Sequence, residues 1–336
     1  MFRVTMAEVV SRAQEFTDAV LFPSAMDVDS ADIIPAANLD ALAAAGLYGI
    51  AGPAEAGGLN ADLATLCRVI EIMAGGCLTT TFVWLQHHGA VRAIAATDNN
   101  LLRSRWLSPL CRGERRTGIA LGGARPGPPL LRAKRVSGGY LLDGTAPWVT
   151  GWDQIDAVYT LARDDNGQLV AALLPAQLCE HLTAHRLSLV AVNASRTVEL
   201  TFSGYFAPDD LVCSVFPHAE WLARDATGLR PNGSLSLGVA ARCCQLAGLG
   251  PLDDELTELR ARLDAADAES MPAARAAASE FAFRAAGAAA AVGGSNAIRA
   301  GHHPQRLVRE ALFLLVFGSR PTIKESLTRL LTAGSG

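Results

Sequence analysis

The spacing of hydrophobic residues changes twice along the chain, and these changes divide it into three parts. In the first part apolar residues recur every three to four positions, as they do on one face of a helix. This spacing predicts helices at 6–20, 38–45, 61–75, 79–96 and 99–111. Pro23 and Gly46 are expected to end the first two, because proline cannot continue a helix and glycine favours its C-terminal cap.

Near Gly118 the hydrophobic period falls to two residues, which is typical of strands. Strands are predicted at 118–122, 130–136, 139–142, 155–162, 168–174 and 196–202. Short strands separated by turns predict an all-β unit, either closed or sandwiched. From about Phe216 the helical spacing returns, with helices predicted at 234–247, 252–268, 272–292, 304–317 and 321–332.

The predicted fold class is therefore α+β. Its three domains are an N-terminal helical domain (1–116), a middle β-domain (117–215) and a C-terminal helical bundle (216–336). The order of elements lacks the βαβ alternation of a dinucleotide fold. The glycine-rich run from Gly122 to Gly127 is therefore not a dinucleotide fingerprint, since no helix follows it.

Composition narrows the class of partner. Of the 336 residues 50% are hydrophobic and 18% charged, the net charge is −4, and the basic residues are scattered, so neither nucleic acid nor a membrane is an expected partner. Arg275, Glu280 and Arg284 interrupt the one alanine-rich segment long enough to suggest a membrane span. Seven cysteines without a Cys-x-x-Cys pair, and no basic start followed by an apolar block, predict reduced thiols, no metal site and a cytoplasmic location.

The stretch Gly139–Thr150 reads as a hairpin that ends in Trp148, Val149 and Thr150. Because side chains alternate along a strand, Trp148 and Thr150 are expected on one face and Val149 on the other. A flat apolar wall beside a hydroxyl suits a planar heteroaromatic ligand such as a flavin. Ordinary strand packing is the other interpretation of the same pattern.

Four segments of the chain together resemble the acyl-CoA dehydrogenases. They are the loop Ala43–Gly58, the segment Trp106–Glu114, the strand Gly144–Thr150 and the stretch Ser195–Leu211, in the family's order and spacing over residues 40–212. The resemblance implies the three-domain fold already predicted and an oxidoreductase of lipid metabolism that uses FAD. It also implies an acyl-CoA thioester as substrate, and an oligomer with copies of itself or with another chain of the family.

The resemblance also assigns roles to individual residues. Trp148 would lie against the flavin ring, with Val149 on the same strand, and Thr150 would hydrogen-bond the ring near N5. The backbone from Ile119 through Leu121 to Gly122 would pass the pyrimidine side of the ring. Gly127 would let its loop approach the flavin phosphates.

The chain departs from the family pattern at several cofactor positions. Gly122-Gly123-Ala124 replaces a hydroxyl residue, an acid and a proline, and Pro128-Pro129 replaces Ser and Asp, so side chains that would order this loop are missing. After Gly248 the family's Arg-x-x-Phe-Gly segment looks deleted, which marks a shortened, divergent member. Loss of that arginine's phosphate contact predicts FAD binding weaker by roughly one to two decades.

The carboxylate that removes the substrate's α-proton in this family also looks absent. Phe317 stands at the usual glutamate position and Gly228 at the position used by a minority of members. Glu310 and Glu325 are substitutes to consider, although Arg309 and Glu310 also suit a structural ion pair.

The adjacent pair His87 and His88 offers another polar group, and His88 is a candidate for the substrate cavity. Neighbouring helix positions diverge by about 100°, so at most one histidine faces a ligand, and a structural histidine is the other interpretation. Three functions stay open: an impaired or partner-dependent acyl-CoA dehydrogenase, a non-catalytic subunit of a heteromeric one, and a flavin-dependent monooxygenase on the same fold.

Overall fold

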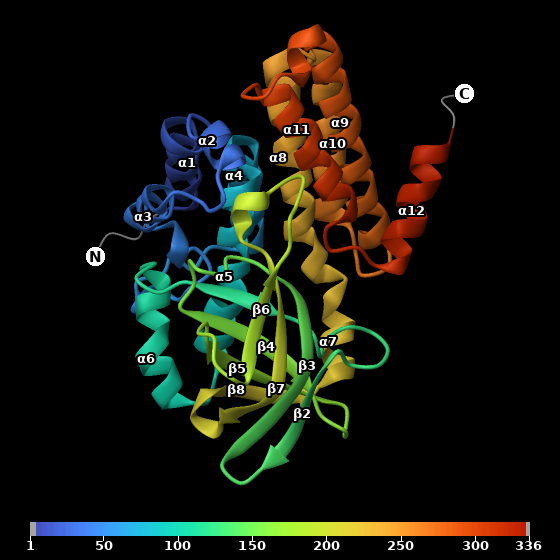
Figure 1. Cartoon of the computed structure of the whole chain (residues 1–336). Coiled ribbons are helices and arrows are strands. Elements are labelled where there is room, and N and C mark those ends of the chain that lie inside the picture. The colour runs from blue at the N-terminus through green and yellow to red at the C-terminus, as the bar shows by residue number, and fades with distance from the viewer. Residues whose placement is uncertain (1–4, 334–336) are drawn as a thin grey trace.

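The computed structural model describes residues 5–333 and contains a helical N-terminal part, a β-domain and a C-terminal helical bundle (Figure 1). Helices form the first third because their apolar positions share one face. They are α1 (Met6–Phe16), continued by the π-turn Thr17–Leu21, then α2 (Ala25–Ser30), α3 (Ala36–Ala44), α4 (Leu63–Gly76), α5 (Leu78–Ala96) and α6 (Asn100–Cys111). Gly46 lies in the left-handed region (φ 68°) just after α3, as the sequence predicts.

The middle of the chain forms one eight-stranded sheet in the lower half of Figure 1. Its strands are β1 (Thr117–Ala120), β2 (Leu131–Val136), β3 (Gly139–Val149), β4 (Ala157–Arg163), β5 (Gln168–Pro175), β6 (Leu182–Arg186), β7 (Val198–Pro208) and β8 (Val212–Pro217). The order is β6-β7-β3-β2-β4-β5-β8, and β1 pairs in parallel with β4. Strand β3 is therefore an interior strand, with β2 on one side and β7 on the other.

The C-terminal third is helical again. It contains α7 (His218–Asp225), α8 (Arg230–Ala247), α9 (Asp253–Ala265), α10 (Met271–Gly293), α11 (His303–Val316) and α12 (Pro321–Thr332). Helices α8 to α11 stand side by side above the sheet, and α12 lies at the outer edge (Figure 1). Within residues 5–333 no helix is long and apolar enough to cross a membrane.

The predicted α+β fold class and the order of its three parts are confirmed. The domain boundaries at 116 and 215 stay predictions, although β8 runs past the second to Pro217. The hydrophobic pattern did not predict four of the helices and strands: α2, β6, α7 and β8. All four are short, with at least two exposed positions each, so they carry little of the periodicity on which prediction depends.

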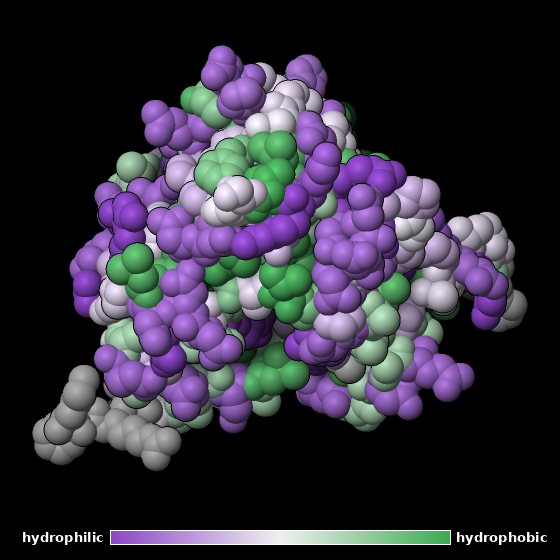
Figure 2. Space-filling view, turned by 90° about the horizontal axis from the view of Figure 1, so that it is seen from below, coloured by the Kyte–Doolittle hydropathy of each residue, from purple (hydrophilic) through white to green (hydrophobic). Residues whose placement is uncertain are grey.

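Helix α5 connects the three parts. Its buried residues join one core shared by the N-terminal and C-terminal helices, which includes Phe82, Leu78 and Leu314. Further along the helix, Val91 and Ile94 belong to a second core beneath the sheet. Seen from below, the molecule is mostly polar, and hydrophobic residues gather around a hollow near the centre of the view (Figure 2).

Candidate functional site

The end of β3 departs from regular strand geometry at the predicted ligand position. The pairing of β3 with β7 shifts register between Ala146 and Val149, which is a β-bulge. Trp148 has φ 65°, and its residue is 55% exposed, whereas Val149 is fully buried. The predicted alternation of Trp148 and Thr150 along one strand face is therefore wrong as a geometric argument, because the bulge breaks it and the strand ends at Val149.

The conformation of Trp148 is itself informative. A bulky residue in the left-handed region costs of order 1–3 kcal/mol, and such strain gathers at sites where a side chain must be presented. Five non-glycine residues have positive φ in the part of the chain that the structure describes, and four of them lie in two adjoining segments. These are Trp148, Asp153, Val192 and Arg196. The exposed indole is thus held out by a locally strained framework.

The two segments are hydrogen-bonded to each other. Gly151 N–H donates to Ser195 O at 2.8 Å, and Trp152 N–H donates to Arg196 O at 3.2 Å. The Arg196 guanidinium donates to Asp153 Oδ2 at 2.9 and 2.6 Å. Behind Trp148, Thr150 Oγ1 lies 3.2 Å from Thr197 Oγ1, which lies 2.8 Å from Ser195 Oγ. Two residues after the exposed Trp148, the chain therefore joins a buried row of three hydroxyls.

The loop after β1 is closed against the sheet. A Cβ on Gly122 would lie 2.3 Å from Thr145 O, and one on Gly123 only 2.6 Å from the backbone of β4. The missing hydroxyl at Gly122 is therefore a packing requirement of this chain, since no side chain fits there. Gly127 has φ 83° and open space around it, which agrees with a loop that something can approach.

Two residues outside the predicted site, Arg163 and His218, hold this loop in place. Arg163, on β4, donates through Nη1 to His218 Nδ1 at 2.6 Å and through Nη2 to Gly127 O. His218, the first residue of α7, donates through Nε2 to Ala124 O at 2.9 Å. Together they tie the loop from both sides, a task that we had expected of the absent Ser and Asp.

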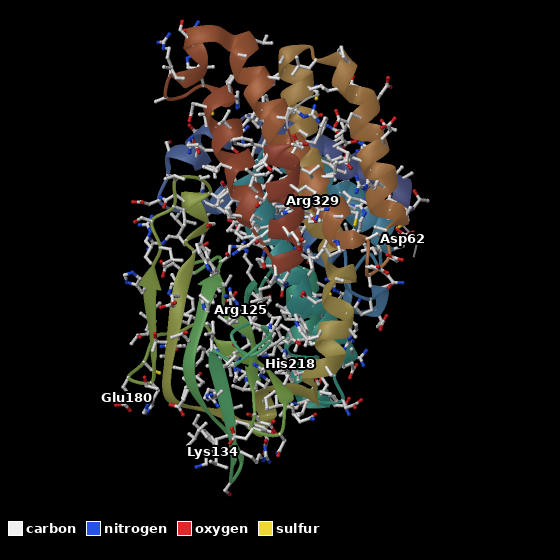
Figure 3. The ribbon with its side chains drawn as sticks, turned by 90° about the vertical axis from the view of Figure 1, so that its right-hand side faces the viewer. Asp62, Arg125, Lys134, Glu180, His218 and Arg329 are labelled. Carbon is white, nitrogen blue, oxygen red and sulfur yellow. The ribbon has the colours of Figure 1, made fainter. Side chains whose placement is uncertain are left out.

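Arg163 and His218 could not be recognised from their own surroundings in the sequence. They lie far apart in the chain, and only the folding of β4 beside α7 brings them together. Burial, and after it the nearby Arg132, lower the pKa of the Arg163 guanidinium. Arg125 lies on the same loop with its side chain exposed, between the sheet and the helices and near His218 (Figure 3).

Both histidines of α5 lie inside the protein. His87 Nε2 lies 3.1 Å from Leu110 O, and Nδ1 accepts from Thr117 N–H at 3.3 Å, so His87 joins α5, α6 and β1. Burial lowers the pKa of His87 to about 4. His87 is therefore a structural histidine, which is the second of the two interpretations of the pair His87 and His88.

His88, the substrate-cavity candidate, has no exposed surface. Its ring stands edge-on to Trp84 with the centroids 4.4 Å apart, and neither ring nitrogen has a partner among the described residues. Burial lowers its pKa well below the usual range, so it is neutral at physiological pH. As it lies here, it does not present a polar group to a ligand.

The position expected for the catalytic carboxylate is filled by aromatic rings. Phe317 lies with its ring centroid 4.9 Å from that of Phe82 on α5 and 5.4 Å from that of Phe313 on α11. Phe82 and Phe313 are 5.1 Å apart. We call these three residues the aromatic cluster. It joins α5 to the end of α11 and contains no group that can take a proton.

Neither substitute carboxylate is free. Glu310 is buried and accepts from Arg306 Nη1 at 2.7 Å, while its second oxygen has no partner among the described residues. Burial raises its pKa, and Arg306 partly opposes the shift. Glu325 is exposed on α12 beside Arg329.

The expected ion pair between Arg309 and Glu310 is wrong. Arg309 pairs instead with Asp29 of α2, at 2.5 and 3.0 Å, because α11 packs on α2 and turns Arg309 toward it. Glu310 turns inward on the same helix and takes Arg306, one turn earlier, as its partner. The pairing follows helix faces rather than adjacency in the sequence.

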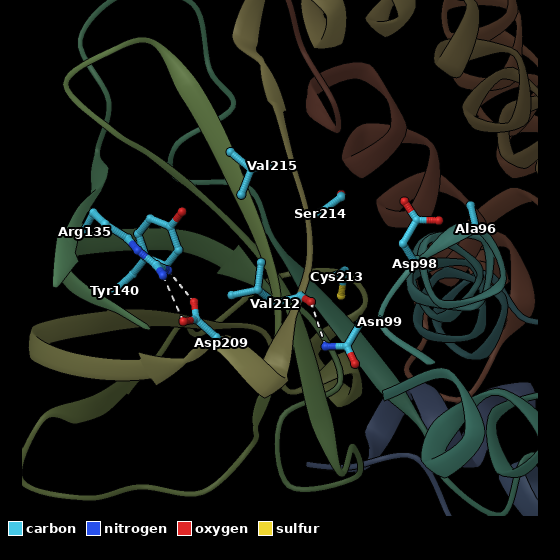
Figure 4. Close-up of a pocket in the computed structure, with 10 residues that line it drawn as sticks. All are labelled: Ala96, Asp98, Asn99, Arg135, Tyr140, Asp209, Val212, Cys213, Ser214 and Val215. Carbon is cyan, nitrogen blue, oxygen red and sulfur yellow. Dashed lines mark hydrogen bonds and ion pairs between the residues drawn. The ribbon is translucent and has the colours of Figure 1, made fainter. Parts of the chain in front are cut away.

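A surface cavity of about 520 Å³ lies elsewhere, between the start of α6 and strand β8. Figure 4 shows its main contacts, the ion pair between Arg135 and Asp209 and the bond from Asn99 Nδ2 to Val212 O at 3.1 Å. Arg135 also lies over the ring of Tyr140. None of the predicted site residues lines this cavity.

Comparison with known proteins agrees with the geometry. The sequence profile of the acyl-CoA dehydrogenase N-terminal domain matches residues 5–114. Benzylmalonyl-CoA dehydrogenase of Aromatoleum aromaticum is 27% identical over 200 residues, which are 58% of this chain and 53% of that protein. The chain thus spans about half the length of this relative.

Two solved structures share the whole fold. One described as PigA with FAD and proline has a TM-score of 0.84 at 18% identity, covering 98% of this chain and 99% of the other. A glutaryl-CoA dehydrogenase of Mycobacterium smegmatis in complex with FADH2 has a TM-score of 0.82 at 15% identity, covering 98% and 95%. At these identities the likeness concerns the fold.

Proposed function

The chain is a member of the acyl-CoA dehydrogenase family, and from this premise we propose that it binds FAD at the end of β3 and handles an acyl-CoA thioester without a base of its own. One observation carries the proposal. At the edge formed by Trp148 and Thr150, which we call the indole–hydroxyl edge, the indole is exposed, while Phe317, at the position where the resemblance expects the carboxylate, lies in the aromatic cluster. The reaction class is oxidoreduction in lipid metabolism.

The residues at the end of β3 fit a flavin ring. The exposed indole of Trp148 offers a flat apolar surface, and the loop at Gly127 an open approach, while the hydroxyl of Thr150 is only 2% exposed and could donate only to a ligand packed against the end of β3. Solved neighbours of the same fold hold FAD or FADH2. When bound, FAD would accept the two electrons removed from the acyl group; this chain's part would be to hold the ring against Trp148 and to donate from Thr150.

The same residues do not fit removal of the α-proton. A positioned base contributes 10² to 10⁴ in rate, and the aromatic cluster supplies none. Glu310 is engaged with buried Arg306, and Glu325 is exposed on the last helix. We infer that a second chain of the same family supplies the base, as in a heteromeric dehydrogenase. The exposed apolar side chains Leu312 and Val316 on α11 suit such an association.

The flavin-dependent monooxygenase needs a polar group that reaches the substrate. Both histidines proposed for that role are fully buried, so no observation favours this alternative.

The test is the visible spectrum of the purified chain after incubation with FAD and removal of excess cofactor. We expect bound flavin, no bleaching by butyryl-CoA or longer thioesters, and no exchange of the thioester α-proton with D₂O. When a family chain that carries the glutamate is added, we expect both the bleaching of the flavin and the exchange of the α-proton. Rapid bleaching by this chain alone would refute the missing base, and failure to bind FAD would refute the cofactor.

A further inference from the structure

The three hydroxyls behind Trp148 form a row with a fixed number of protons. Ser195, Thr197 and Thr150 each carry one hydroxyl proton, and the row contains two contacts, at 2.8 and 3.2 Å. Each contact uses one proton, so a single proton remains for a partner outside the row. The exposures of the three residues are 0%, 2% and 2%, which keeps water from the inner members.

Only one arrangement of the protons lets Thr150 donate outward. Ser195 must donate to Thr197, and Thr197 must donate to Thr150. In either other arrangement the remaining proton leaves from Thr197 or Ser195. Neither of these hydroxyls contacts any further acceptor among the residues that the structure describes. The Thr150 hydroxyl likewise contacts no further acceptor among these residues, so the outward arrangement becomes the favoured one when a ligand offers an acceptor to Thr150, because it alone then leaves no buried donor unpaired.

We propose that Ser195 and Thr197 are positioning residues that direct the hydroxyl proton of Thr150 toward the ring ligand of the indole–hydroxyl edge. The inference rests on the proposed function, since the ligand is the proposed FAD. In this arrangement Thr150 stands at the ligand end of the row, beside the exposed Trp148, and Ser195 at the fully buried end. With such a ligand bound, the row therefore has one favoured direction.

The backbone holds the row in place. Gly151 N–H donates to Ser195 O, and the ion pair between Arg196 and Asp153 joins the same two segments beside it. Val192 and Arg196, on either side of Ser195, have φ 51° and 48°. The strain surrounds the inner end of the row, where a purely packed strand end would need none.

The first experiment is FAD binding to Thr197→Val, measured by the polarisation of flavin fluorescence. Valine keeps the shape of threonine and favours a strand, but it removes the hydroxyl that donates to Thr150. We expect the dissociation constant to rise about three- to tenfold, the effect of one misdirected hydrogen bond. The visible absorption bands of bound FAD should move as well, because a donor near the ring changes its electronic surroundings.

Two variants control for a structural effect. Thr197→Ser keeps the hydroxyl and should bind FAD as the wild type does. Thr160→Val removes another fully buried threonine hydroxyl, on β4, whose only described acceptor is Val158 O. It should leave affinity and spectrum unchanged. Thermal melting of each chain without FAD reports any loss of folding separately.

The decisive comparison uses Thr150→Val and the double variant Thr150→Val/Thr197→Val. If Thr197 acts through Thr150, the double variant should bind FAD as Thr150→Val does. An equal further loss in the double variant, or wild-type affinity in Thr197→Val, would overturn the proposal and leave the proposed function standing. A wild-type chain that binds no FAD would overturn both.

Discussion

The indole–hydroxyl edge and the aromatic cluster lie at the two positions to which the family resemblance assigns a function, and their structures differ in opposite ways. At the edge, Trp148 is 55% exposed on a strained backbone, and polar groups gather behind it. At the cluster, Phe82 is 5% exposed, and three rings contact one another edge-on or stacked. The strained backbone at the edge lowers the stability of the fold while it holds the indole in solvent. The ring contacts in the aromatic cluster raise the stability of the fold.

If the base is absent, as proposed, this difference argues against general decay of the site. A decaying site would be expected to relax its strain, because the strain has a cost and no longer any use. Four left-handed residues surround the edge, whereas Phe317, at the position where a base was expected, is packed against other rings. The pattern suits a chain that still holds a ligand and leaves proton removal to another group.

The prediction with the largest expected effect concerns Glu310, and it tests whether this residue stabilises the fold or acts as a base. Glu310→Ala would leave the buried Arg306 guanidinium without its carboxylate, which costs about 3–5 kcal/mol of unfolding free energy. Urea denaturation measures the loss. Glu325→Ala, at an exposed pair, should change stability by less than about 1 kcal/mol. A stable Glu310→Ala chain that lost thioester chemistry would instead make Glu310 the base.

The second prediction concerns pH and the buried His87. Its folded pKa of about 4 lies below the ordinary 6.5, so the folded state binds the proton less tightly than the unfolded state. The stability is therefore fully present above about pH 6.5 and falls as pH decreases toward 4, by about 3 kcal/mol in total.

Urea denaturation between pH 7.5 and 4.5 measures this slope. In His87→Gln the slope should be shallower, because glutamine does not titrate. The remaining slope includes His88, whose pKa is also lowered. An unchanged slope in His87→Gln would show that His87 is not buried as a neutral acceptor for Thr117.

The third prediction separates presentation from packing at Trp148. Trp148→Gly should lower FAD affinity about 10- to 100-fold, since stacking on an aromatic side chain contributes about 1–3 kcal/mol. It should also raise or preserve the stability of the chain without FAD, because glycine adopts φ 65° without strain. Binding and denaturation are measured on the same preparation. Loss of stability with unchanged FAD affinity would make Trp148 a packing residue.

The sequence predicted well wherever a long periodic segment decided the outcome. Helices α4, α5 and α10 lie within a few residues of their predicted bounds, because many apolar positions on one face outweigh any local exception. The positions of Trp148 and Thr150 next to the end of β3 also follow from the hairpin pattern. The bulge at Trp148 does not, because a register shift depends on how β7 pairs with β3.

The polar contacts were the least predictable part. Arg163 and His218 tie the loop at Gly127, and the hydroxyls of Thr150 and Thr197 meet, across long separations in the chain. Arg309 likewise pairs with Asp29, which is distant in the sequence, and not with the adjacent Glu310. The partner of a polar side chain depends on which elements pack together, and the spacing of hydrophobic residues does not predict that packing.

The smallest expected effect lies on the outer face of α11, next to the aromatic cluster. Leu312 and Val316 are 43% and 65% exposed, so changing each to glutamine should alter the stability of the isolated chain by no more than about 0.5 kcal/mol. Leu314→Gln on the buried face should cost several times more, since it places an amide among apolar side chains. If a second family chain covers the outer face, the double variant Leu312→Gln/Val316→Gln should lose co-elution with that chain and keep its own stability. A large loss of stability in the double variant alone would mean that this face is already covered within the chain, and the proposed partner would then need another surface.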